Sequence, residues 1–108
     1  MNIKDKTRIM HIIEAIDEIA LYVSEKNRDR KTELAITRLI EIIGEASNHL
    51  SEELKAEHAY IPWRQIVNMR HIIVHEYFGV DSNALWKVAK DNIPDLGQKL
   101  KNIIKTKE

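Results

Sequence analysis

The chain has 108 residues, which is the length of one domain, and its 17 lysines and arginines balance 17 aspartates and glutamates. Zero net charge excludes a protein that coats nucleic acid or membrane through its overall field, and the absence of cysteine excludes disulfides and thiolate metal sites. Because we find no secretion signal and no apolar run of about 18 residues, we expect a cytoplasmic protein without membrane contact.

Apolar residues recur at intervals of three and four, and only three glycines and two prolines interrupt the sequence. This pattern predicts one all-α domain over residues 1–108, an up-down bundle of four to five helices. Ser51 should cap a short helix, Pro62 should open a helix that continues to Tyr77, and a bend should follow at residues 92–94. The other helices should span residues 6–26, 32–50, 83–91 and 95–104, with Leu96, Leu100 and Ile103 inward.

The first helix has a wider apolar stripe than a small bundle needs, because Met10 and Leu21 extend it. The excess indicates an oligomeric interface, unless these residues lie under the C-terminal helices. In the second helix Gly44 is unfavourable by about 1 kcal/mol relative to alanine, which a close helix crossing would explain.

Arg70, His75 and Tyr77 stand at fixed offsets in the apolar segment that follows Pro62. On an ideal helix Arg70 and Tyr77 share a sector with apolar side chains, so the guanidinium needs a partner or a cleft. Arg70 and His75 lie about 140° apart on such a helix, so they meet only if it loosens before Gly79 or if two copies face each other. These groups suit phosphate handling, although a clamped arginine, a surface histidine and a buried tyrosine would give the same pattern.

A metal centre is a weaker interpretation. His71 and His75 are four residues apart, as two zinc ligands on a helix can be, but the glutamate follows the second histidine instead of preceding it. The Glu-x-x-His repeats of a di-metal bundle are also missing. Glu41 and Glu45 therefore form a solvated face or accept from Arg38 or Arg64. We predict no metal and no cofactor.

Aromatic residues offer another interpretation. Trp63, Trp86 and Tyr60 could stack on nucleobases, but two tryptophans in a small helical domain more often fill a core or an interface. The sequence lacks a glycine-rich loop before a helix, which excludes a P-loop or dinucleotide fold.

The spacing of arginine, four residues, histidine, one residue and tyrosine resembles the active-site signature of the HEPN ribonucleases, specifically the HepT-like toxins. Residues 35–46, 61–67 and 75–81 resemble that family's second helix, third helix and the exit from it, and Trp86 with residues 93–96 fits the C-terminal part. The resemblance covers nearly the whole chain. One departure is His71, where relatives typically carry asparagine.

The resemblance implies a homodimeric, metal-independent endoribonuclease toxin of a type VII-like toxin–antitoxin pair. Arg70 and His75 would be catalytic, and a partner nucleotidyltransferase antitoxin would silence the toxin by attaching AMP to Tyr77. Arg64, His71 and Arg38 are weaker candidates for contact with the RNA. The alternative is a non-catalytic helical adaptor that binds a nucleotidyltransferase.

Overall fold

The computed structural model describes residues 1–75 and 79–107, with the backbone only at residues 72, 74, 75, 79, 80 and 107. Along the chain the elements are α1 (Ile3–Glu25), α2 (Arg30–Asn48), α3 (Glu52–Glu57), α4 (Trp63–Val67), α5 (Met69–Ile73), β1 (Val74–His75), β2 (Gly79–Val80), α6 (Ser82–Lys87), the π-helical turn η1 (Val88–Asn92) and α7 (Ile93–Lys107). The all-α class is confirmed apart from the two short strands. Since α6, η1 and α7 follow one another without a break, the described residues form six separate helical segments instead of four to five.

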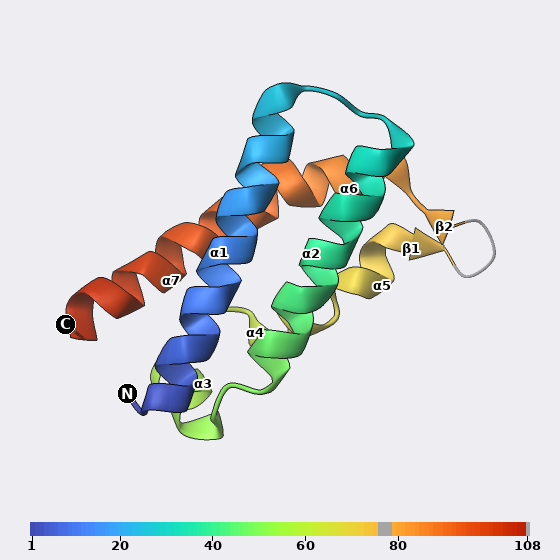
Figure 1. Cartoon of the computed structure of the whole chain (residues 1–108). Coiled ribbons are helices and arrows are strands. Elements are labelled where there is room, and N and C mark those ends of the chain that lie inside the picture. Colours follow the sequence, from blue (N-terminus) through green and yellow to red (C-terminus); the bar gives the residue numbers. More distant parts are fainter. Residues whose placement is uncertain (76–78, 108) are drawn as a thin grey trace.

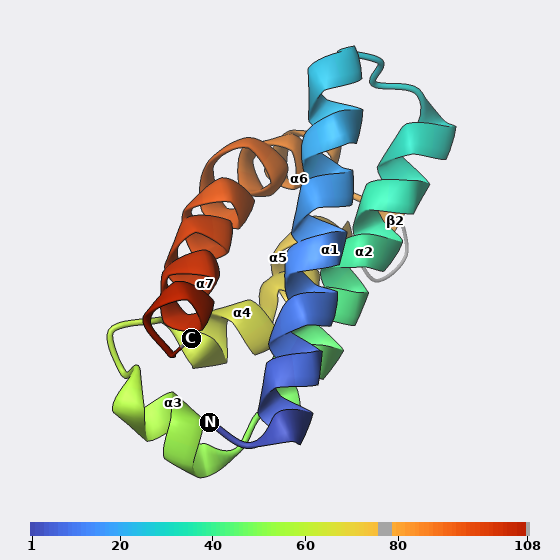
Figure 2. The same cartoon turned by 60° about the vertical axis from the view of Figure 1, so that its left-hand side comes forward.

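The helices α1 and α2 lie side by side and form the centre of the fold (Figure 1). Helix α7 packs along α1, and α4 and α5 pack against α2, as the second view also shows (Figure 2). The shared core is rich in isoleucine, whose branched side chains fill the space between helices. Its fully buried members include Ile9, Ile12, Ile19, Ile36, Ile40, Ile43, Ile73, Ile93 and Ile103. No described helix is both long and apolar enough to cross a bilayer.

Four helices begin at a polar residue whose side-chain oxygen accepts a hydrogen bond from the backbone N–H three residues on. These residues are Asn2, Asp29, Ser51 and Asp81. The predicted cap at Ser51 is confirmed. Asp81 caps α6, the helix expected over residues 83–91.

The helix expected over residues 62–77 is wrong in its extent. It is interrupted at Asn68, whose backbone N–H donates to the carbonyls of Arg64 and Ile66 and so closes the end of α4. A second short helix ends at Ile73, and the backbone then becomes extended, with Val74 opposite Val80 and His75 opposite Gly79. The apolar spacing of this segment fits a helix, but backbone pairing decides its end.

The expected bend at residues 92–94 is also wrong in part. The chain stays helical there, and the irregularity is the π turn over Val88–Asn92. Pro94 is the second residue of α7, directly after the π turn, where the backbone hydrogen bonds already depart from the regular α-helical pattern. The predicted inward positions of α7 are confirmed, since Leu96, Leu100 and Ile103 are all buried.

The broad apolar stripe of α1 is only partly covered. Met10 is 41% exposed and Leu21 is 65% exposed, so the interpretation that both lie under the C-terminal helices is wrong. The structure contains one copy of the chain, and the expected dimer stays a prediction.

Candidate functional site

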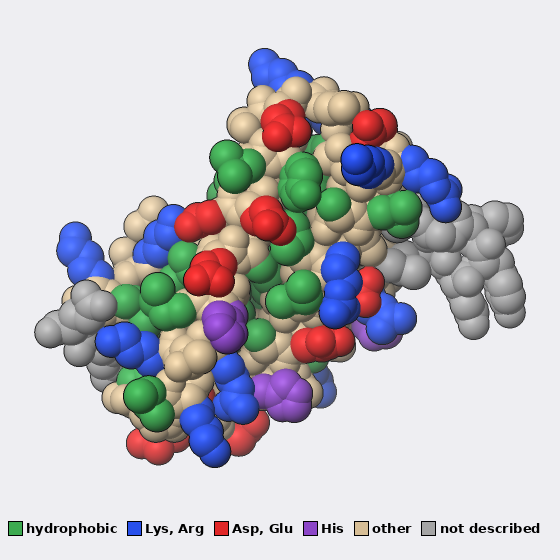
Figure 3. All heavy atoms as spheres, viewed as in Figure 1, with side chains coloured by type: hydrophobic (Ala, Val, Ile, Leu, Met, Phe, Trp, Pro, Cys, Tyr) green, Lys and Arg blue, Asp and Glu red, His purple; other side chains and the backbone are tan. Residues whose placement is uncertain are grey.

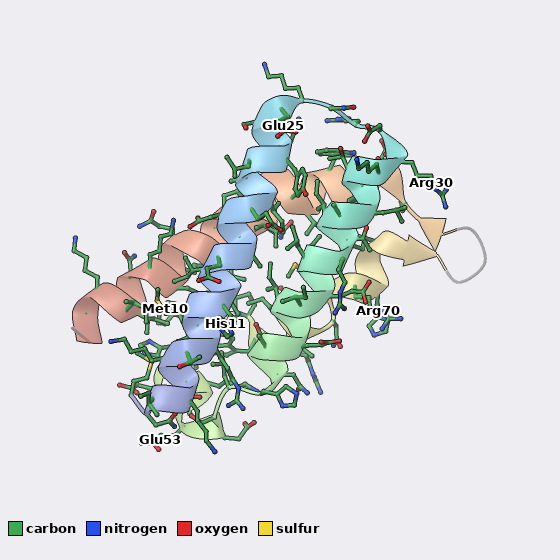
Figure 4. The ribbon with its side chains drawn as sticks, in the orientation of Figure 1. Met10, His11, Glu25, Arg30, Glu53 and Arg70 are labelled. Carbon is green, nitrogen blue, oxygen red and sulfur yellow. The ribbon has the colours of Figure 1, made fainter. Side chains whose placement is uncertain are left out.

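A small cavity of about 150 Å³ lies where the second half of α2 faces α4 and α5. Arg70 and His71 line it from α5, and Glu41 and Glu45 line it from α2. In the same orientation, Figure 3 shows basic, acidic and histidine side chains gathered along the edge of α2 where Figure 4 labels Arg70. The cavity therefore brings one of the predicted catalytic residues next to a mixed set of charges.

Gly44 allows the two walls of the cavity to approach each other. A Cβ atom on Gly44 would lie 3.1 Å from the carbonyl oxygen of Val67 and 3.5 Å from that of Ile66. These carbonyls belong to the last turn of α4, just before Asn68. The predicted close helix crossing at Gly44 is thus confirmed, and it fixes the distance between α2 and the helix break.

Arg70 is exposed, although the helical wheel placed it among buried side chains. Its neighbours Met69 and Ile73 are buried as expected. The wheel assumed one continuous helix, whereas α4 ends at Val67 and Arg70 lies in the separate short helix α5. Within the described ranges Arg70 has no ion pair, even though Glu41 and Glu45 line the same cavity. Its guanidinium donors are thus available to an anion.

His75 and Tyr77 complete the predicted motif. The backbone of His75 lies in β1, so it does not occupy the helical position four residues after His71 that a metal pair would need. Its side chain, and Tyr77 altogether, lie outside the described residues. The helix does loosen before Gly79, which is one of the two conditions for Arg70 and His75 to meet. The wheel relation between Arg70 and Tyr77 no longer applies, because α5 ends at Ile73.

The weaker RNA-contact candidates fall into two groups. Arg64 and His71 line the same large groove between α4–α5 and α6–α7. Arg38 lies apart from that groove and from the small cavity, with its side chain 62% exposed and 3.9 Å from Glu41. The structure therefore brings together two of the three residues, and Arg38 forms an ion pair with Glu41.

The tryptophans are not stacking platforms, because Trp63 is 9% exposed and Trp86 is 3% exposed. Tyr60 remains exposed. Each indole N–H has a hydrogen-bond partner: the carbonyl of His58 for Trp63, and Glu33 for Trp86. The described part of the chain contains no group of three or more histidine, aspartate or glutamate side chains arranged to hold a metal ion.

Glu33 anchors the start of α6, which follows the segment that carries Arg70, His75 and Tyr77. Its Oε2 accepts from Trp86 Nε1 at 2.8 Å and also from Ser82 Oγ, so α2 holds the start of α6. The Arg28 guanidinium lies 5.0 Å from the centre of the Trp86 ring, on its face. Directly before α6, the backbone N–H of Asp81 donates to the carbonyl of Ile73. This hydrogen bond holds Ile73 and Asp81 together, on either side of His75 and Tyr77.

Sequence reasoning missed Asn68 and the groove residues of α6 and η1. Asparagine often ends a helix, so Asn68 was a signal within the sequence itself. Lys87, Asp91 and Asn92 gave no such signal, because they come to line one groove with Arg64 only in the folded chain.

Comparison with known proteins gives one consistent result. Residues 9–103 match the family model described as "Ribonuclease HepT-like". A protein of Thermococcus cleftensis named "Probable ribonuclease HepT" is 40% identical over 99 residues, which cover 90% of each chain. No solved structure gives a significant match.

Several relatives come from Methanocaldococcus jannaschii. One, named "Gamma-glutamylcyclotransferase and putative RNase", is 36% identical over 104 residues and 92% of this chain. The aligned region makes up 47% of that relative, so the chain spans about half its length. Another, named "Putative RNase", is 29% identical over 105 residues, which cover 93% of this chain and 87% of the relative.

Proposed function

The chain belongs to the HepT-like ribonuclease family, and on this premise we propose that it is an endoribonuclease toxin that cuts RNA without a metal ion. The observation that carries the proposal is the state of Arg70. It is exposed, has no ion pair within the described part of the chain and lines a cavity five residues ahead of His75. An unpaired guanidinium with a planar fork of donors is suited to a phosphodiester.

The proposed reaction is attack of the ribose 2′-OH on the adjacent phosphorus. A base removes the proton of the 2′-OH, the bond to the 5′-oxygen breaks, and an acid protonates that oxygen. His75 supplies the base and the acid, and Arg70 stabilises the charge on the phosphorane. The products are a 2′,3′-cyclic phosphate and a 5′-hydroxyl.

One imidazole cannot easily serve as base and acid in the same turnover. We propose that a homodimer supplies His75 twice, once neutral and once protonated, since imidazole titrates near neutral pH. The partial exposure of Met10 and Leu21 supports a partner for this chain, because α1 keeps uncovered apolar surface. Sedimentation equilibrium tests this step, and a monomer that cleaves RNA at its full rate would reject it.

We further propose that a nucleotidyltransferase antitoxin attaches AMP to Tyr77. The phenol oxygen would attack the α-phosphorus of a nucleoside triphosphate, and pyrophosphate would leave. The bound adenylyl phosphate could then occupy the donors of Arg70 as a false substrate. The test is to adenylylate Tyr77 and measure RNA cleavage. Full activity after complete modification would reject the proposal.

The experiment for the nuclease itself compares Arg70→Ala with Arg30→Ala. Arg30 is an exposed arginine at the start of α2, away from the cavity, as Figure 4 shows. We expect Arg70→Ala to lower the cleavage rate at least about a hundredfold, because a phosphate clamp acts mainly in the transition state. Arg30→Ala should keep the parental rate. Equal rates for Arg70→Ala and the parent would contradict the proposed role.

A further inference from the structure

A second hollow of the described chain is a groove with a volume of about 990 Å³. Helices α4 and α5 form one wall, and α6, η1 and α7 form the other, as Figure 2 shows for the elements themselves. Sites for small molecules usually have volumes of about 300–1,000 Å³, so this groove can hold more than one nucleotide unit.

This groove and the small cavity at Arg70 share a residue. His71 lines both, with Arg70 directly before it in the same short helix. A chain whose phosphate lies on Arg70 can therefore continue past His71 into the groove. The groove thus extends the proposed site.

The charges of the groove favour a polyanion at one part of its wall. Arg64 and Lys87 line it, and neither has an ion pair within the described residues. Lys99 is already paired with Asp95 at 2.9 Å, which leaves Asp91 as the lining carboxylate that opposes an anion. The free positive charges therefore lie at the α4 and α6 sides of the groove.

Apolar and amide groups make up much of the remaining lining. Ile66, Met69 and Leu96 line the groove but are only 4–5% exposed. Pro62 is an exposed apolar residue of the lining, and it provides an apolar surface against which the flat face of a base can pack. The side chains of Asn68 and Asn92 make no hydrogen bond with any other described residue, although both line the groove. Free amides can pair with the Watson–Crick edges of bases, which are exposed only in unpaired RNA.

The π turn contributes Val88, Asp91 and Asn92 to this wall. Such turns are rare and frequently occur at functional sites, since they redirect side chains that a regular helix would place elsewhere.

We propose that this groove is the subsite for the unpaired nucleotides that flank the scissile phosphate. Arg64 and Lys87 bind backbone phosphates, the apolar surface receives a base face, and His71 connects the subsite to Arg70. The inference rests on the proposed function, because both involve the same RNA. The subsite can be tested by RNA binding alone, whereas the nuclease proposal needs a cleavage assay.

The test measures the affinity of a fluorescein-labelled, unstructured 12-nucleotide RNA by anisotropy, with His75→Ala present in every sample so that the RNA is not cut. Adding Arg64→Ala and Lys87→Ala should raise the Kd at least tenfold. Loss of two phosphate contacts should also lower the slope of log Kd against log salt by about 1.4. The control adds Arg30→Ala and Lys90→Ala, which remove the same charge at exposed positions that do not line the groove. The control should bind RNA like the parent.

A second variant changes the affinity in the opposite direction. Asp91→Asn removes the opposing carboxylate and should lower the Kd severalfold. Parental affinity in the Arg64 and Lys87 variant, or an equal loss in the control, would overturn the subsite and leave the nuclease proposal standing. If RNA binding depends on the groove but the chain with His75 cuts no RNA, the nuclease proposal fails and the binding site remains.

Discussion

A Cβ atom on Gly44 would stand 3.1 Å from the carbonyl oxygen of Val67. Gly44 belongs to α2, and Val67 is the last residue of α4 before the helix break at Asn68. Both residues line the cavity that contains Arg70. The absence of a side chain at position 44 therefore sets how closely α2 approaches the segment that positions the proposed phosphate clamp.

Gly44→Ala should separate stability from activity. Alanine gains about 1 kcal/mol in helix propensity, while contact with a backbone carbonyl opposes that gain. We expect the free energy of unfolding to change by less than about 1 kcal/mol. RNA cleavage should fall at least tenfold, because the end of α4 moves away and Arg70 moves with it. Urea unfolding and initial cleavage rates measure the two effects, and an unchanged rate would show that this approach does not matter for activity.

Gly97→Ala is the matched control for that variant. A Cβ atom on Gly97 would lie 2.9 Å from Cγ2 of Ile16, in the contact between α7 and α1 and away from the cavity. Overpacking should lower the free energy of unfolding by about 1–2 kcal/mol after the gain in helix propensity. The cleavage rate per folded molecule should stay parental. A variant more stable than the parent would mean that the two helices separate without cost.

Glu33→Ala should loosen the start of α6. The substitution leaves the buried indole N–H of Trp86 and the hydroxyl of Ser82 without their acceptor. We expect a loss of about 1–3 kcal/mol in the free energy of unfolding, since an unsatisfied buried donor is costly. Glu18→Ala, at an exposed position of α1, should change it by less than about 0.5 kcal/mol. Equal effects of the two substitutions would argue against the anchor.

Asp29 predicts a pH dependence of stability. Hydrogen bonds from the side chain and backbone of Thr32 lower the pKa of Asp29 below its ordinary value of 3.8. A carboxyl whose pKa is lower in the folded state stabilises the fold above its unfolded pKa, and that contribution disappears as the pH falls through the folded pKa. Asp29→Asn should therefore be less stable than the parent at neutral pH, and this difference in stability should shrink as the pH falls below 3.8. Thermal melts across this range measure the difference, and a gap that is the same at every pH would contradict it.

The sequence was sufficient to predict the two long helices, the cap at Ser51 and the inward face of α7. In α1 and α2 the apolar period is sustained over several turns, so local preference and packing agree. Residues 62–77 were harder, because Ile66, Met69 and Ile73 fit a helical period although the chain breaks at Asn68. There the helix ends where β1 pairs with β2. Gly79 and Val80, the residues of β2, lie beyond the predicted end of the helix at residue 77, so the helical pattern contains no information on this pairing.

The candidate site was predictable only as a motif. The order of Arg70 and His75 is a property of the sequence, but the exposure of Arg70 is a property of the folded chain, in which the helix breaks at Asn68. The groove was not predictable, because its walls come from α4–α5 and α6–α7 and meet only in the folded chain. A helical wheel describes one helix and contains no information on how separate helices pack against each other.

The most direct test is cleavage of RNA by the parent and by His75→Ala in excess EDTA, with analysis of the product ends. We expect the parent to yield 2′,3′-cyclic phosphate and 5′-hydroxyl ends. We expect His75→Ala, while still folded and dimeric, to yield no cleavage above background. Full activity of His75→Ala, or cleavage that stops when EDTA is added, would contradict a metal-independent nuclease that depends on His75. A parent that binds a nucleotidyltransferase but cuts no RNA would instead support the helical adaptor.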